Sequence, residues 1–139
     1  MVLTMLLVPS CKKSPPEVFP LKRLTSVEKG TTAQGDTYEI KTEYFVVANP
    51  PREQVALKAV LDTYNAKTLS QAEIDAYAAT FRVFFRETKS TPRDYAESNE
   101  GYFAHDRIDD HARDTLVRVK WTKGSTDGEY TFYSEDELP

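Results

Sequence analysis

Both histidines of the chain and four of its carboxylates lie within residues 105–114. These residues are His105, Asp106, Asp109, Asp110, His111 and Asp114. Imidazole and carboxylate groups together bind zinc and other divalent ions, so a metal-assisted hydrolase is one hypothesis. Its metal ligands would be His105, Asp109, Asp110 and His111.

The spacing of these residues matches no closed ligand set such as H-E-x-x-H. Arg107 and Arg113 also balance the charge without a metal, and charge-rich runs usually form exposed surface. A solvated, internally paired loop is therefore the preferred interpretation.

Aromatic side chains are abundant, with eight Tyr, seven Phe and one Trp. Exposed Tyr and Trp form platforms for sugar rings and hot spots for protein partners. The candidate ligand or partner surface consists of Tyr102, Trp121, Tyr130 and Tyr133. It supports a second hypothesis, a carbohydrate- or peptide-binding module. Most of these aromatics alternate within predicted strands, which is also typical of core positions.

Basic residues recur at alternate positions of two predicted strands. They are Arg82 and Arg86 in residues 80–87, and Arg118 and Lys120 in residues 115–123. If the two strands are neighbours, one sheet face carries a cationic ladder that Glu39 and Glu43 would pair with, at ~0.2–1 kcal/mol for each pair. We expect such pairs on a solvated face. An anion or acidic-glycan site is the alternative.

Motifs for nucleophilic or cofactor chemistry are missing from the sequence. It contains no G-x-S-x-G, no G-x-x-x-x-G-K-[ST] and no G-x-G-x-x-G. The single cysteine, Cys11, leaves no internal disulfide to form. We therefore predict no catalytic residue and no cofactor, and a binding protein more than an enzyme.

The charge of the chain is unevenly distributed. The formal net charge is −4, but residues 11–36 carry five basic and three acidic residues, whereas residues 37–139 carry thirteen and nineteen. Nucleic-acid binding needs a net cationic footprint, so an acidic domain argues against it.

The N-terminus combines a short apolar run with a cysteine. Residues 2–8 (VLTMLLV) are too few to span a bilayer but are about the minimum for a signal-peptide core. Residues 7–11 (LVPSC) resemble a bacterial lipobox, and the following KKSPP resembles the opening of small lipoproteins in gram-negative envelopes. The resemblance covers residues 1–16. It implies a lipid on Cys11, a signal-peptide remnant in residues 1–10, and a location in the cell envelope. Because no basic residue precedes the apolar run, we expect the true start codon to lie upstream.

The remaining sequence predicts a tether followed by one α+β domain. Residues 11–36 contain Pro15, Pro16 and Pro20 and are expected to form the tether, although Val18, Leu21 and Leu24 suggest that part of it packs on the domain. The domain, residues 37–139, has alternating strand patterns at 37–47, 80–87, 115–123 and 129–134, the last two joined as a hairpin. Leu57, Val60, Leu61 and Tyr64 mark the main helix, and Ser70-x-x-Glu73 is the capping box of a short one. The fold class expected is α+β: an antiparallel sheet of about four strands, with one main helix and a short second helix on one face.

These observations favour an envelope lipoprotein whose domain binds or scaffolds another component without catalysis. Its expected partners are the membrane, through the lipid anchor, and an envelope protein or glycan. Nucleic acid is not expected to be a partner.

Overall fold

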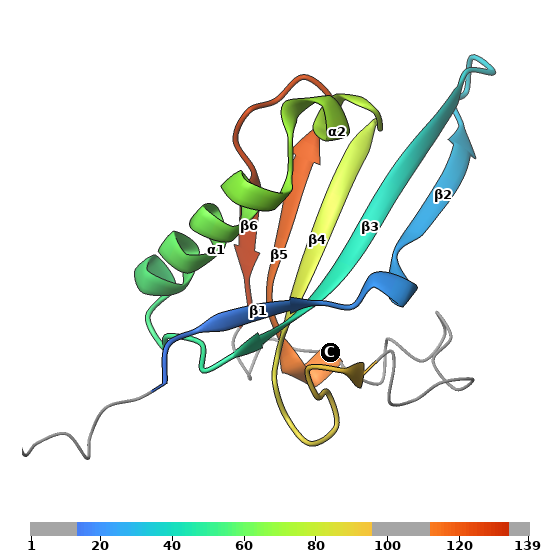
Figure 1. Ribbon diagram of the computed structural model, residues 1–139. Coiled ribbons are helices and arrows are strands. Elements are labelled where there is room, and N and C mark those ends of the chain that lie inside the picture. Colours follow the sequence, from blue (N-terminus) through green and yellow to red (C-terminus); the bar gives the residue numbers. More distant parts are fainter. Residues whose placement is uncertain (1–13, 96–111, 134–139) are drawn as a thin grey trace, which may run out of the picture.

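The computed structural model describes residues 14–95 and 112–133 and shows an α+β fold (Figure 1). Its elements are β1 (Glu17–Pro20), the 3₁₀ helix η2 (Lys22–Leu24), β2 (Ser26–Thr31), β3 (Thr37–Ala48), α1 (Gln54–Thr68), α2 (Gln71–Asp75), β4 (Ala79–Arg86), β5 (Thr115–Thr122) and β6 (Glu129–Phe132). In this part of the chain six strands form one sheet. One main helix and a short second helix accompany them, as the sequence predicted.

The sheet has the order β1-β3-β4-β5-β6, and β2 also pairs with β3. β1 and β2 are both antiparallel to β3 and lie along different halves of it: Val18 is opposite Val47, whereas Glu28 is opposite Ile40. η2 lies between these two strands in the sequence, where the edge of the sheet changes from one to the other (Figure 1).

The expectation of a four-stranded antiparallel sheet was wrong in strand number and in one strand direction. β3 and β4 pair in parallel, with Phe45 opposite Phe84. Parallel neighbours need a long crossover, which is usually helical, and α1 and α2 provide it here. The other pairings are antiparallel, including the predicted β5–β6 hairpin.

Within residues 14–95, regular structure is already present at β1, twenty residues before the position expected from the sequence pattern. Residues assigned to the tether form two of the strands. Pro20 is tolerated because β1 is an edge strand, where an N–H can be lost without breaking a central ladder. Leu21 and Leu24 are 1% and 2% exposed, so the predicted packing of this segment on the domain is confirmed.

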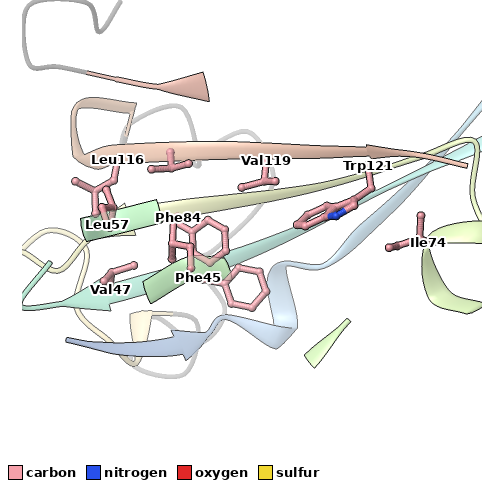
Figure 2. Packing of buried hydrophobic residues seen from close by; sticks show 10 residues of the cluster. Phe45, Val47, Leu57, Ile74, Phe84, Leu116, Val119 and Trp121 are labelled. Atoms are coloured by element: carbon pink, nitrogen blue, oxygen red, sulfur yellow. The ribbon is translucent and has the colours of Figure 1, made fainter. Parts of the chain in front are cut away.

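Apolar clusters of buried residues lie on both faces of the sheet. The larger one joins α1 and α2 to the inner faces of β3, β4 and β5, where the rings of Phe45 and Phe84 stack 4.9 Å apart (Figure 2). The smaller one lies on the opposite face and contains Leu21, Leu24, Val46, Phe85 and Tyr95. Burial of aliphatic and aromatic side chains of this size contributes ~1.5–3 kcal/mol each.

The predicted helices are confirmed. Leu57 and Leu61 of α1 are buried against the sheet, as their spacing indicated. Ser70 caps α2 with a complete capping box: its hydroxyl accepts from the Glu73 N–H, and the Glu73 carboxylate accepts from the Ser70 N–H. Neither helix in the described residues has the length and apolar character needed to cross a membrane.

Candidate functional site

A cleft of about 350 Å³ lies between the two helices and the β5–β6 hairpin. We call it the hairpin cleft. Its lining residues come from α1, from the α1–α2 region and from the hairpin, and they are Lys58, Asp62, Asn65, Ala66, Leu69, Gln71, Ile74, Trp121, Thr126, Asp127, Gly128 and Tyr130. Mixed apolar walls with a few placed polar groups are typical of small-ligand sites.

Tyr130 joins the hairpin side of the cleft to α1. Its hydroxyl donates to Asp62 Oδ1, while Lys58 Nζ donates to Asp62 Oδ2 at 2.8 Å. The Lys58 ammonium also lies 4.7 Å from the centre of the Tyr130 ring, a cation–π distance. Lys58 and Asp62 are one helical turn apart, so regular α1 geometry presents both to the same ring.

A polar network continues from Tyr130 beneath α1. The buried Asn65 donates from Nδ2 to the Tyr130 hydroxyl at 3.4 Å, and its Oδ1 accepts from Arg82 Nη1 at 2.9 Å. Arg82 in turn donates from Nε to Glu43 Oε1 at 3.0 Å. Asn65 therefore connects the hairpin cleft to a buried ion pair between β3 and β4. On the far side of this pair lies a second cavity, of about 340 Å³, which Glu43, Tyr64 and Arg82 help to line.

The pKa values of Asp62 and Tyr130 are displaced in opposite directions. Burial acts to raise the pKa of Asp62, but hydrogen bonds from Lys58 and Tyr130 outweigh it and hold the pKa below its ordinary value. Burial, together with the adjacent Asp62 carboxylate, raises the pKa of Tyr130 well above its ordinary value. General acid–base catalysis works best with a pKa near the operating pH, so this pair is better suited to hydrogen bonding than to proton transfer.

The rim of the cleft is fastened by hydrogen bonds between α2 and the hairpin loop. Gln71 Nε2 donates to Asp75 Oδ1 at 3.0 Å and to the Ser125 carbonyl at 2.9 Å. The Gly124 N–H donates to the same Asp75 oxygen at 2.9 Å. At Gly128 a Cβ atom would lie 2.5 Å from Val119 Cγ1, so a glycine is needed for the loop to lie this close to β5.

The cleft offers a ligand both apolar surface and polar groups. Leu69, Ile74 and Trp121 form an apolar part of its wall. Within the described residues Asp127 is exposed and makes no hydrogen bond or ion pair, so its carboxylate is available at the mouth. Trp121 is only 4% exposed and contributes mainly to the core, whereas Tyr130 is half-buried.

The residues singled out in the sequence do not share one site. Trp121 and Tyr130 meet in the hairpin cleft, but Tyr133 lines a different cavity near the start of β5. Asp114, at the end of the predicted metal segment, accepts hydrogen bonds from the Thr88 and Thr91 hydroxyls at 2.8 and 2.7 Å. The residues that lie outside the described part of the chain are Cys11, Tyr102, His105, Asp109, Asp110 and His111. Within residues 14–95 and 112–133, no three His, Cys, Asp or Glu side chains are grouped to hold a metal ion.

The predicted cationic ladder does not form. β4 and β5 are neighbours, but the register places Arg118 opposite Val83, so Arg82 points to the other face of the sheet. That face is covered by α1, and Arg82 is 2% exposed. The expected contact between Arg82 and Glu43 does occur, as a buried pair rather than on a solvated face.

Asn65, Asp62 and Gln71 were missed in the sequence analysis. One signal for Asn65 was present, because it continues the i, i+4 series of Leu57 and Leu61. A polar residue on the apolar stripe of a helix needs a buried partner, since an unpaired buried polar group is costly.

No known protein family, curated protein or solved structure matches the chain.

Proposed function

We propose that this chain is a non-catalytic binding domain that a lipid on Cys11 anchors to a membrane of the bacterial envelope. In this proposal the hairpin cleft holds a sugar or peptide group of another envelope component. The observation that carries the binding part is the cleft itself, in which aromatic and aliphatic walls lie beside the free carboxylate of Asp127.

The anchor part is supported by the lipobox-like residues 7–11 and by the distance from Cys11 to the first strand. β1 begins at Glu17, six positions after Cys11, so the chain between them reaches at most about 20 Å when extended. The side chain of Asn49 contacts the Pro15 carbonyl, with 3.5 Å from Nδ2 to the oxygen, so the last part of the link follows the domain. A domain on so short a link stays close to the membrane surface.

The binding part is supported by the chemistry of the cleft. Sugars and peptides present apolar faces together with hydroxyl and amide groups, which aromatic walls and a carboxylate acceptor complement. The rim bonds of Gln71 and Asp75 hold the cleft in shape before a ligand enters, which lowers the entropic cost of binding.

Trp121 provides a direct assay because it is the single tryptophan of the chain and lines the cleft. Its fluorescence would be titrated with a soluble muropeptide, which carries both sugar and peptide groups. We expect a saturable change, weakened about tenfold by Asp127→Asn through the loss of a charged hydrogen-bond acceptor. Asp36→Asn, at the exposed turn between β2 and β3, is the matched control and should bind like the parent. An unchanged titration in Asp127→Asn, or no spectral response at millimolar muropeptide, would contradict this use of the cleft.

The anchor is tested separately by intact-mass analysis of the protein extracted from its own membrane. A mature chain that begins at Cys11 and carries acyl mass is expected. Cys11→Ala should remove both the lipid and the membrane association. A soluble chain that retains residues 1–10 would refute the anchor.

A further inference from the structure

A third cavity, of about 230 Å³, lies where α1 and β5 begin and β4 ends. Three arginines from three separate segments line it: Arg52 before α1, Arg86 at the end of β4, and Arg113 before β5. We call it the arginine pocket. Tyr133 and Asp114 complete part of its wall.

The three guanidinium groups are available to a ligand. All three side chains are exposed, and none forms a hydrogen bond or ion pair within the described part of the chain. The buried Arg82 and the exposed Arg93 differ in this respect, because each has a carboxylate partner at 3.0 Å or less.

The pocket is locally cationic in an acidic protein. Its one described carboxylate, Asp114, uses Oδ2 to accept from two threonine hydroxyls and forms no ion pair with the arginines in this part of the chain. The described lining therefore carries three positive charges and one negative charge, although the whole chain carries −4. Like charges brought together in this way repel one another unless an anion balances them.

We propose that the arginine pocket binds a phosphate group, supplied by an anionic lipid headgroup of the membrane. Guanidinium forks match the oxygens of phosphate with paired, charge-assisted hydrogen bonds. Arginines from three segments can approach a tetrahedral anion from different directions. A planar carboxylate has only two oxygens in one plane and pairs with fewer of them.

The position of the pocket identifies the membrane as the phosphate source, a step that depends on the proposed anchor. Arg52 follows three residues after Asn49, whose side chain contacts the Pro15 carbonyl. Cys11 precedes Pro15 by four residues, at most about 14 Å of extended chain. The arginine pocket thus lies at the end of the domain where the chain enters from the anchor, while α2 and the hairpin loop lie at the opposite end (Figure 1). Headgroup binding would leave the rim of the hairpin cleft facing away from the membrane.

The test uses the full chain carrying Cys11→Ala, so that no acyl group contributes to binding. Cosedimentation would be measured with vesicles of phosphatidylcholine alone and with 30% phosphatidylglycerol, and inorganic phosphate would be titrated separately. The informative variant is Arg52→Gln/Arg86→Gln/Arg113→Gln. The matched control is Lys29→Gln/Lys67→Gln/Lys123→Gln, which removes the same charge from exposed positions outside the pocket. Every variant keeps the same apolar N-terminus, so its partitioning into vesicles cancels.

We expect the affinity for the anionic vesicles to fall about a hundredfold in the arginine variant. Each basic residue at a lipid surface contributes a factor of about five to the affinity, and the variant removes three of them. The lysine control should lose less than fivefold. Equal losses in the two variants would overturn the proposal, because general charge attraction would then explain the binding. Arginine-dependent binding of inorganic phosphate without vesicle binding would overturn the lipid assignment in favour of a soluble phosphate ester. Because no variant can be acylated, these results do not depend on whether the native chain carries a lipid.

Discussion

Replacing Arg82 tests the buried polar network of this domain most directly. Arg82→Met keeps much of the apolar volume and removes the guanidinium group. That group donates to Glu43, Asn65 and the side chain of Thr68 at 3.0, 2.9 and 2.7 Å, and to the Thr68 carbonyl at 3.2 Å. It also lies 4.8 Å from the centre of the Phe45 ring. Its contacts connect β3, β4 and the C-terminal end of α1.

The expected loss follows from what the substitution leaves behind. Removing one partner of a fully buried ion pair costs ~3–5 kcal/mol. The Glu43 side chain is 18% exposed, so its carboxylate regains some water and the cost falls toward the lower end. Asn65 is 6% exposed, and its Oδ1 loses the hydrogen bond that Arg82 donates; leaving this buried acceptor unpaired costs ~1–3 kcal/mol. Taking the lower end of each range, we expect a loss of about 4 kcal/mol in the free energy of unfolding, a large share of the ~5–15 kcal/mol typical of a domain.

Urea unfolding, followed by Trp121 fluorescence and by far-UV circular dichroism, measures this loss. The control is Arg118→Met on the adjacent strand, where the side chain is exposed and lies 5.3 Å from the centre of the Phe81 ring. It should change stability by no more than about 0.5 kcal/mol. If Arg82→Met costs under about 1 kcal/mol, or no more than Arg118→Met, the assigned role of the network is refuted. In a double-mutant cycle, Arg82→Met and Glu43→Met should show a coupling of at least ~1 kcal/mol.

Further substitutions test local parts of the fold. Ser70→Ala should cost ~1 kcal/mol by removing the α2 cap. The Ser70 N–H donates to the Glu73 carboxylate and lowers its pKa below the ordinary value of 4.5. The contribution of this carboxylate to the free energy of unfolding is therefore complete above pH 4.5 and is lost as the pH falls through the lowered pKa. Urea midpoints measured between pH 3 and 6 should show a weaker dependence on acid in Glu73→Gln. Gly30→Ala should change stability by no more than about 0.5 kcal/mol, because its Cβ would meet the Tyr38 ring, which is 38% exposed and can turn aside. A larger loss that Tyr38→Ala relieves in a double-mutant cycle would contradict this expectation. Asp75→Ala removes the acceptor for the Gly124 N–H, and hydrogen exchange at that amide should become at least fivefold faster; unchanged protection would contradict the role of Asp75 in holding the rim.

Local patterns in the sequence were sufficient for most of the central elements. The alternation in residues 37–47, the helical spacing of Leu57 and Leu61, and the capping box at Ser70 all predicted structures that were found. Each signal comes from neighbours on one strand or helix, where side-chain periodicity is set by backbone geometry alone. β1 and β2 were not predicted because they contain Pro20 and Gly30, residue types that are disfavoured inside strands.

The direction and register of strand pairing could not be predicted in the same way. The alternation of residues 80–87 correctly separated Arg82 from Phe81 and Val83, but it did not show which face α1 covers. The buried ion pair, the Asn65 connection and the meeting of Trp121 with Tyr130 in one cleft all follow from that choice.

Residue order alone was enough for the period of the longer elements, the N-terminal cap of α2, the acidity of residues 37–139 and the apolar run that precedes Cys11. The folded arrangement was needed to show that β3 and β4 run in parallel, that Arg82 lies beneath a helix, and that Arg52, Arg86 and Arg113 line one pocket. Periodicity records contacts within a few residues, whereas a buried charge or a binding pocket depends on contacts between segments tens of residues apart.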